Sequence, residues 1–240
     1  MNSCRKSPYK IKIYYRVLIF LTFVTASPAF SQDLAVTGKL KDYCRQSAED
    51  SLKQMIELRS LVPFLAYDLK YAGTNNFTRR QLYKKNDLAF LRNLPARALC
   101  KAEQELNAKG LGLKIFDAYR PHAVTRKMWD LVKDERYVAN PSKGSGHNRG
   151  LSVDLTIIDL STGKELDMGT GFDNFTDTAH HDFTNLPEDI LSHRKLLREI
   201  MENHGFRALS TEWWHYSWPN DLPYEVLDIP HSKLEKSCNN

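Results

Sequence analysis

The chain has 240 residues, of which 26% are charged and 42% hydrophobic, and a formal net charge of +5. This length and composition suit one globular domain with a sizeable core, and the sequence contains no repeat or low-complexity tract. Residues 1–31 hold five of the 34 basic residues and none of the 29 acidic ones, so the remainder is formally neutral. The basic balance therefore gives no support for nucleic-acid binding.

The first 31 residues have the pattern of a cleaved secretory signal. A basic stretch up to Arg16 precedes an apolar run at 17–26, and small residues stand at the −3 and −1 positions before Gln32. The apolar run is too short to span a bilayer comfortably, so an uncleaved membrane anchor ranks second. We expect export to a periplasm or to the medium, with no stable membrane span after cleavage.

Three cysteines remain after this cleavage. In an oxidising compartment Cys44 and Cys100 could form a bridge, which would leave Cys238 in a floppy polar tail. The alternative is that all three thiols are free. The spacing of the three cysteines matches no zinc-cysteine motif. The sequence leaves the pairing open.

The first half of the mature chain gives few helix signals. Residues 32–52 predict an N-terminal extension or a marginal helix, and residues 53–240 the main domain. Apolar and polar residues alternate at 55–61, as in a half-buried strand. The tract at 63–77 ends in a Gly/Asn cluster and predicts a long loop of the kind that often lines a site.

The second half alternates helices and strands irregularly. Helices are expected at 94–109, which begins at Leu94-Pro95 and ends before Gly110, at 121–133 and at 187–204. Strands are expected at 113–119, 152–158, 206–209 and 213–218, with loops at 140–146 and 163–184. This order predicts an α+β single domain with a central, mostly antiparallel sheet flanked by helices. No Gly-rich phosphate loop joins a strand to a helix, which disfavours a nucleotide enzyme.

Two short stretches carry the residues suited to chemistry. His147 and Asp154 stand seven positions apart, and Glu212 and His215 lie in an aromatic run. Two histidines and an aspartate suit zinc and leave a position for water, while a nearby glutamate can act as general base. Strand geometry requires His147 on the loop before its strand and favours Glu212 in a turn. On these residues alone, a capping Ser145, a core histidine and a surface glutamate remain close alternatives.

The pattern S-x-H-x-x-G-x-(small)-x-D, followed later by E-x-x-H, resembles the zinc D-amino-acid peptidases. Within that group the chain is most similar to the VanX-type D-alanyl-D-alanine dipeptidases. The segments that carry the resemblance lie in the right order between about 55 and 218: 67–72 with 76–78, 117–121, 145–155, 168–173 and 212–216. One departure is Ser152, where the family usually has alanine, and we expect no consequence for metal binding.

The resemblance implies one zinc ion per chain, held by His147, Asp154 and His215. It also implies that Glu212 is the catalytic base and that Arg120 stabilises the oxyanion with fixed donors. Without the resemblance, Arg120 would be interpreted as a strand-end arginine paired to a surface acid.

The resemblance further suggests three substrate-binding residues. A free dipeptide carries an ammonium and a carboxylate close together, so its pocket needs an acid and a hydroxyl or cation within a short span. Asp173 and Tyr71 match positions associated with the amino end, and Ser145 matches one near the carboxylate. The alternatives are a turn-forming Asp173, a core Tyr71 and a loop hydrogen bond at Ser145.

The implied activity is zinc-dependent hydrolysis of the D-alanyl-D-alanine dipeptide to two D-alanines, by attack of zinc-bound water, in cell-wall peptide metabolism. The nearest rival is a peptidoglycan D,D- or L,D-carboxypeptidase, for which wall peptides are the partner. Tyr71 and Asp173 favour the dipeptidase because they would close the amino end of a short pocket. A non-catalytic zinc- or wall-binding module is the third hypothesis, and a pure binder would need neither Glu212 nor Arg120.

Overall fold

The computed structural model describes residues 34–84, 88–235 and 238. The signal segment expected over residues 1–31 lies outside these residues. The strands are β1 (Val36–Thr37), β2 (Met55–Glu57), β3 (Ala66–Tyr67), β4 (Phe90–Arg92), β5 (Leu111–Asp117), β6 (Ser152–Asp159), β7 (Arg207–Leu209), β8 (Glu212–Ser217) and β9 (Val226–Leu227). The helices are α1 (Leu40–Glu49), α2 (Leu58–Leu61), α3 (Asn93–Asn107), α4 (His122–Trp129), α5 (Gly146–Arg149), α6 (Glu188–Asn203) and α7 (His231–Leu234).

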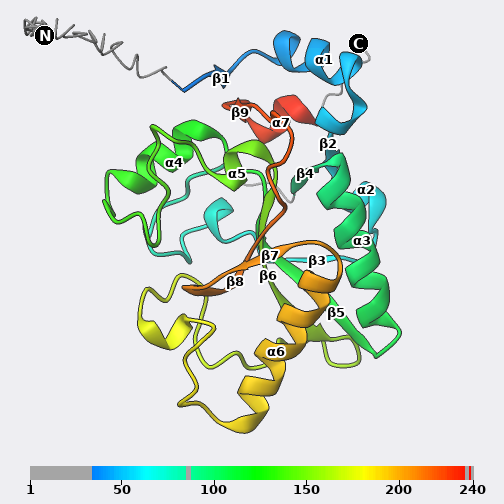
Figure 1. Ribbon diagram of the computed structural model, residues 1–240, viewed down its shortest axis with the longest axis vertical. Helices are drawn as coiled ribbons and strands as arrows, with labels where there is room; N and C mark the ends of the chain where they lie inside the picture. The colour runs from blue at the N-terminus through cyan, green and yellow to red at the C-terminus, as the bar shows by residue number, and fades with distance from the viewer. Residues whose placement is uncertain (1–33, 85–87, 236–237, 239–240) are drawn as a thin grey trace, which may run out of the picture. The chain divides into compact units, whose positions relative to one another are not determined.

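A five-stranded sheet of order β3-β5-β6-β8-β7 runs through the middle of the fold (Figure 1). β3 pairs with β5 in parallel, whereas β5, β6, β8 and β7 pair with their neighbours in antiparallel fashion. The long strands β5 and β6 pair from Leu111↔Asp159 to Asp117↔Asp154. The observed α+β architecture confirms the predicted, mostly antiparallel sheet.

The helices α3 and α6 cover one face of this sheet. α3 contacts β5, α6 contacts β7 and β8, and the two helices contact each other (Figure 1). On β6, Val153, Leu155 and Ile157 belong to the core cluster that contains residues of both helices. Because successive side chains of a strand point to opposite faces, Asp154 points to the face that these helices leave open.

The predicted helices at 94–109 and 187–204 are confirmed to within about two residues. Leu99 and Leu106 of α3, and Leu197 and Met201 of α6, are buried at helical spacing. Burying each such side chain contributes about 1.5–3 kcal/mol to folding, which explains why the spacing of apolar residues, together with the terminal proline and glycine signals, located these helices. Gly110 follows α3 with a φ of 74°, a conformation that glycine adopts without strain.

The strand predicted at 55–61 is only partly right. β2 ends at Glu57, whose carboxylate accepts hydrogen bonds from the backbone N–H groups of Arg59 and Ser60 and so starts the short helix α2. A side-chain cap of this kind overrides the alternating pattern. The helix predicted at 121–133 is also too long, because the N–H groups of Leu131 and Val132 both bond to the carbonyl of Met128 and close the last turn.

The N-terminal and C-terminal segments pack together. Residues 40–49 form a helix, β1 pairs in parallel with β9, and Cys44 forms a disulfide with Cys238. The bridge considered between Cys44 and Cys100 is therefore wrong, and Cys238 is not in a floppy tail. Cys100 lies in α3 as a free, half-buried thiol. The apolar contacts of α1 with Leu227, Ile229 and Leu234 explain this pairing, because they bring the two termini together.

A fully buried arginine joins these segments to the helix that carries His147. Arg92 donates hydrogen bonds to the carbonyl groups of Lys53, Arg149 and Glu225, at 2.8 Å for Arg149 and 3.2 Å for Glu225. Burial lowers the pKa of Arg92, and the charge of Glu225 opposes this shift. In the described part of the chain, no helix is long and apolar enough to cross a membrane.

Candidate metal centre and active site

Three predicted ligands from three elements meet in one cluster. Asp154 on β6 and His215 on β8 are directly paired across the sheet, and His147 comes from α5. His215 Nδ1 lies 2.9 Å from Asp154 Oδ1, while His147 Nε2 lies 3.2 Å from His215 Nδ1 and 3.4 Å from Asp154 Oδ2. Among the described residues, this is the group of His, Cys, Asp and Glu side chains close enough to hold one metal ion.

His147 reaches the cluster from a one-turn helix rather than from the predicted loop. Ser145 and Asn148 form a capping box, in which each side chain accepts a hydrogen bond from the other residue's backbone N–H group. Gly150 then ends the turn with a φ of 70°, and β6 begins two residues later. This sharp reversal allows residues seven positions apart to face one ion.

The ring nitrogens that point away from the cluster already have partners. His147 Nδ1 lies 2.6 Å from the carbonyl of Ala118, to which it donates, and His215 Nε2 lies 3.0 Å from Ser217 Oγ. With those protons assigned, the second ring nitrogen of each histidine is an acceptor that faces the other ring and a carboxylate. Three such acceptors in contact call for a cation, and two imidazoles with one carboxylate suit zinc.

The charge states of the ligands fit the same interpretation. Burial lowers the pKa of His215, although Asp154 opposes the shift, so its ring is neutral as a metal ligand must be. Burial disfavours the ionised form of Asp154, but the interactions of its carboxylate with His147 and His215 outweigh burial and hold the pKa of this carboxyl below its usual range. The donor set therefore fits a zinc ion.

Glu212 is the first residue of β8. The prediction that it lies in the preceding turn is therefore wrong. An irregularity in the β7–β8 register brings it to the same side as His215, with Oε2 3.8 Å from His215 Nδ1. It is buried, so the surface-glutamate interpretation is wrong. Burial raises the pKa of Glu212 well above its usual range, and the charges of Asp154 and Asp173 add to this shift.

Arg120 follows β5 and lines the same cavity as the three ligands. Its Nε and Nη2 donate to Asp117 Oδ2 at 2.9 and 2.8 Å, and Nη2 lies 3.8 Å from Asp154 Oδ2. Its partner Asp117 is only 1% exposed, so the alternative of a surface pair is wrong. Burial alone would lower the pKa of Arg120, but Asp117 raises it well above the usual value, which keeps the guanidinium charged.

The two residues expected at the amino end of the substrate contact each other. The hydroxyl of Tyr71 donates to Asp173 Oδ1 at 2.9 Å, and the N–H group of Phe77 donates to Oδ2 at 3.3 Å. Burial raises the pKa of Asp173 to about 7, although these hydrogen bonds oppose the shift. Both residues line the cavity, as does Ser145, whose hydroxyl also caps α5.

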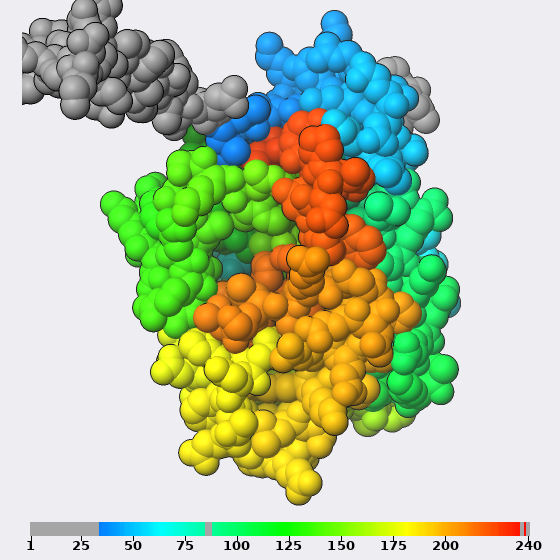
Figure 2. Space-filling model, viewed as in Figure 1, coloured from blue at the N-terminus to red at the C-terminus, as the bar shows by residue number. Residues whose placement is uncertain are grey.

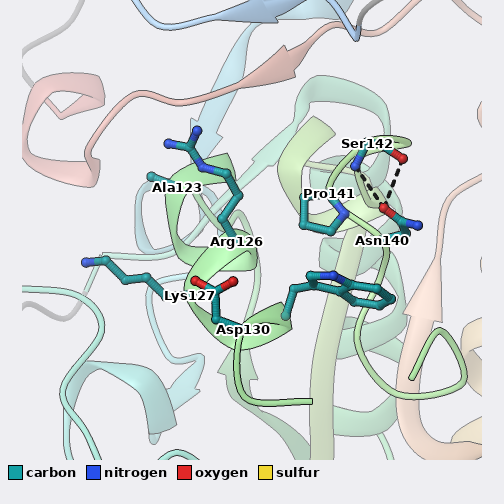
Figure 3. Close-up of a pocket in the computed structure, with 8 residues that line it drawn as sticks. Ala123, Arg126, Lys127, Asp130, Asn140, Pro141 and Ser142 are labelled. Carbon is teal, nitrogen blue, oxygen red and sulfur yellow. Dashed lines mark hydrogen bonds between the residues drawn. The ribbon is translucent and has the colours of Figure 1, made fainter. Parts of the chain in front are cut away.

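The cavity that holds all eight predicted site residues has a volume of about 220 Å³. Figure 2 shows a hollow between the green segment around α4 and α5 and the orange strand β8. A larger cavity of about 560 Å³ lies outside the cluster, between α4 and the segment 140–142. Its charged side chains Arg126 and Lys127 point in different directions (Figure 3), so this cavity presents no convergent chemistry.

Comparison with known proteins identifies the family. A family model described as D-ala-D-ala dipeptidase, of the peptidase M15 group, matches residues 51–237. The chain belongs to this family. It is 35% identical to a D-alanyl-D-alanine dipeptidase of Escherichia coli (strain K12) over 174 residues, which cover 72% of this chain and 89% of that protein. It is also 35% identical to a D-alanyl-D-alanine dipeptidase of Enterococcus faecium over 194 residues, with coverage of 72% and 96%.

Among solved structures, a zinc complex of the vancomycin-resistance D,D-pentapeptidase VanY aligns at 18% identity with a TM-score of 0.37. That alignment covers 55% of this chain and 75% of the other.

As a member of the D-ala-D-ala dipeptidase family, the chain is a metallopeptidase that hydrolyses a small peptide substrate.

Several residues around this candidate site were not singled out from the sequence. Asp117 orients Arg120, and Tyr83 donates to Asp117 Oδ1 at 2.9 Å. Asn148 Nδ2 donates to the carbonyl of Arg120 at 2.8 Å and so ties α5 to β5. The sequence contained signals for two of them, because Asp117 precedes Arg120 by three residues and Ser145-x-x-Asn148 has capping-box spacing.

A further contact involves Ser152, the position at which the resemblance led us to expect alanine. Ser152 Oγ lies 2.7 Å from Ser217 Oγ, which in turn contacts His215 Nε2. Ser152 is fully buried, and its hydroxyl and that of Ser217 form a short chain of contacts that ends at His215. This contact depends on the pairing of β6 with β8 and had no signal in the sequence.

Proposed function

We propose that this protein hydrolyses free D-alanyl-D-alanine to two D-alanines with one zinc ion per chain. The observation that carries the proposal is that a His147–Asp154–His215 cluster, the buried Glu212 and the amino-end pair Tyr71–Asp173 share one small cavity. His147 Nε2, His215 Nδ1 and Asp154 would hold the zinc. When bound there, zinc supplies a Lewis acid that lowers the pKa of a water molecule toward neutrality.

Glu212 and Arg120 provide the acid–base and electrostatic chemistry. Glu212 takes the proton of the attacking water and gives it to the amine that leaves, a task that suits a carboxyl with a raised pKa. Arg120 is fixed by Asp117 through two of its five donors and retains others for the negative charge that develops on the carbonyl oxygen.

The remaining residues select a free dipeptide. Asp173, supported by the hydroxyl of Tyr71, would bind the substrate ammonium. Ser145 accepts a hydrogen bond from the N–H group of Asn148 and keeps its hydroxyl proton to donate to the substrate carboxylate. A carboxypeptidase needs the amino end open for a peptide stem, so this arrangement favours the dipeptidase. A module that only binds zinc or cell wall would need neither the buried Glu212 nor the fixed Arg120, so these two residues also favour an enzyme.

The site of action would be outside the cytoplasm. The signal pattern at residues 1–31 motivates export to a periplasm or to the medium, and the Cys44–Cys238 disulfide suits an oxidising compartment. The mature chain would then consist of the extension at 32–52 and the dipeptidase domain at 53–240. Cell fractionation with N-terminal sequencing tests this: a cytoplasmic protein that still begins at Met1 would contradict export.

The activity is tested by incubating the zinc-loaded mature protein with D-Ala-D-Ala and, separately, with a muropeptide stem ending in the same pair. We expect release of D-alanine from the dipeptide. Release from the stem alone would identify a carboxypeptidase instead, and zinc binding without release from either substrate would identify a binding module.

A further inference from the structure

Three aromatic side chains from three separate loops contact one another in the lining of the cavity. Phe77 lies between β3 and β4, Tyr137 between α4 and α5, and Phe175 in the segment after β6. The ring centroids are 5.2 Å apart for Phe77 and Phe175 and 4.7 Å apart for Tyr137 and Phe175. All three line the cavity that contains the metal cluster. We call Phe77, Phe175 and Tyr137 the aromatic bridge.

The aromatic bridge lies next to the group that would bind the substrate ammonium. The backbone N–H of Phe77 donates to Asp173 Oδ2 at 3.3 Å, and Phe175 follows Asp173 by two residues. Asp173 itself has a φ of 60°, an uncommon left-handed conformation outside glycine. This turn of the backbone sets the carboxylate and the ring of Phe175 on the same cavity.

The loop that carries Tyr137 is attached at its other side as well. Thr211 Oγ1 lies 3.3 Å from the carbonyl of Arg136, to which it donates, so the turn between β7 and β8 supports this loop one residue before the bridge. The aromatic bridge is thus attached at Phe77, through its contact with Asp173, and next to Tyr137, through Thr211. Edge-to-face and stacked contacts between the rings are also favourable.

We propose that the aromatic bridge limits the substrate to two residues by occupying the space into which a peptide would extend from its amino nitrogen. The inference rests on the proposed function and names its specificity determinant. A third residue would be joined at the nitrogen that Asp173 binds, so it would both remove the ammonium charge from that carboxylate and run into the rings of Phe77 and Phe175.

Substrate length is tested with D-Ala-D-Ala and the tripeptide L-Lys-D-Ala-D-Ala. In Phe175→Ala we expect the ratio of kcat/KM for tripeptide over dipeptide to rise about tenfold or more. Tyr137→Ala should raise the ratio in the same direction. Phe175→Tyr keeps a ring in place and should retain the ratio of the wild type. Phe64→Ala removes an aromatic side chain that is 87% exposed and is the control for general loss of apolar surface.

The ratio of Kd for tripeptide over dipeptide is measured on a Glu212→Gln background through tryptophan fluorescence, because Trp214 lines the cavity. This measurement separates the two hypotheses, because it judges the aromatic bridge even if the wild type releases no D-alanine. Equal affinity of the parent for dipeptide and tripeptide would overturn the bridge proposal. So would ratios for Phe175→Ala and Tyr137→Ala within about twofold of the parent. Dipeptide hydrolysis by the wild type would stand in either case.

Discussion

At the scale of single residues, the two histidines of the proposed zinc site contact hydroxyl and carbonyl groups that do not belong to any sequence motif. Ser217 contacts His215 Nε2, and Ser152 contacts Ser217 in turn. We expect Ser217→Ala to weaken zinc binding about 10–100-fold, because the ring of His215 loses the partner that fixes its tautomer and orientation. Competition with a chromophoric chelator measures this. Ser152→Ala, one bond further away, should change the affinity much less, and equal effects of the two changes would contradict the account.

Asp173 makes a prediction about pH. Its pKa of about 7 in the folded protein means that the carboxyl is protonated below this pH and ionised above it. Capture of the substrate ammonium requires the ionised form, so KM for D-Ala-D-Ala should fall as pH rises from 6 to 7.5. In Asp173→Asn, KM should be higher and lose this dependence. A KM of the wild type that is flat over the same interval would contradict the role of Asp173.

At the scale of elements, the sequence predicts the helices whose buried residues repeat at helical spacing. It does not predict the short helices that begin at a single side-chain cap. The helices α3 and α6 were located because several buried residues repeat along each. The short helices α2 and α5 were missed because each depends on one cap, at Glu57 and at Ser145. The register irregularity that turns Glu212 toward His215 is a property of the strand pair β7–β8, which one strand's sequence does not contain.

The turn between α5 and β6 can be tested with two glycines of similar backbone conformation. Gly150 has a φ of 70°, and an added Cβ would lie 2.6 Å from the end of the Met55 side chain. Gly163 has a φ of 67° and no atom within 4 Å of such a Cβ. We expect Gly163→Ala to cost about 1–2 kcal/mol of folding free energy from the backbone alone. Gly150→Ala should cost more, because the buried Met55 side chain must also move, and we expect weaker zinc binding because the turn that follows His147 shifts.

Denaturant unfolding and chelator competition on both variants give these quantities. Equal stability losses, with the zinc affinity of Gly150→Ala unchanged, would show that the turn does not position the ligand.

At the scale of the whole molecule, the fold brings the predicted site residues together through links that the sequence did not predict. The resemblance, carried by segments between residues 67 and 216, suggested eight site residues, and all eight line one cavity. The cysteine pairing could not be predicted, because Cys44 and Cys238 are 194 positions apart and meet only through the packing of α1 on the C-terminal segment. Arg92 likewise links three distant segments by backbone contacts that leave no pattern in the sequence.

The disulfide should stabilise the protein without affecting the metal centre. We expect Cys44→Ser to lower the free energy of unfolding by about 2–4 kcal/mol, because the unfolded chain gains freedom when its ends are released. Zinc affinity should stay near that of the wild type, since the ligands come from the central sheet and α5. Cys100→Ser removes a free thiol and serves as the control. A loss of zinc binding in Cys44→Ser alone would show that the termini help to hold the site.

The central claim is that a buried glutamate acts as the base at a zinc site formed by His147, Asp154 and His215. The most direct test measures zinc content and D-alanine release for the wild type and for Glu212→Gln side by side, with D-Ala-D-Ala as substrate. We predict one zinc ion per chain in both proteins and a turnover lower by about 10²–10⁴-fold in the variant. Loss of zinc from Glu212→Gln, or turnover equal to that of the wild type, would contradict the claim.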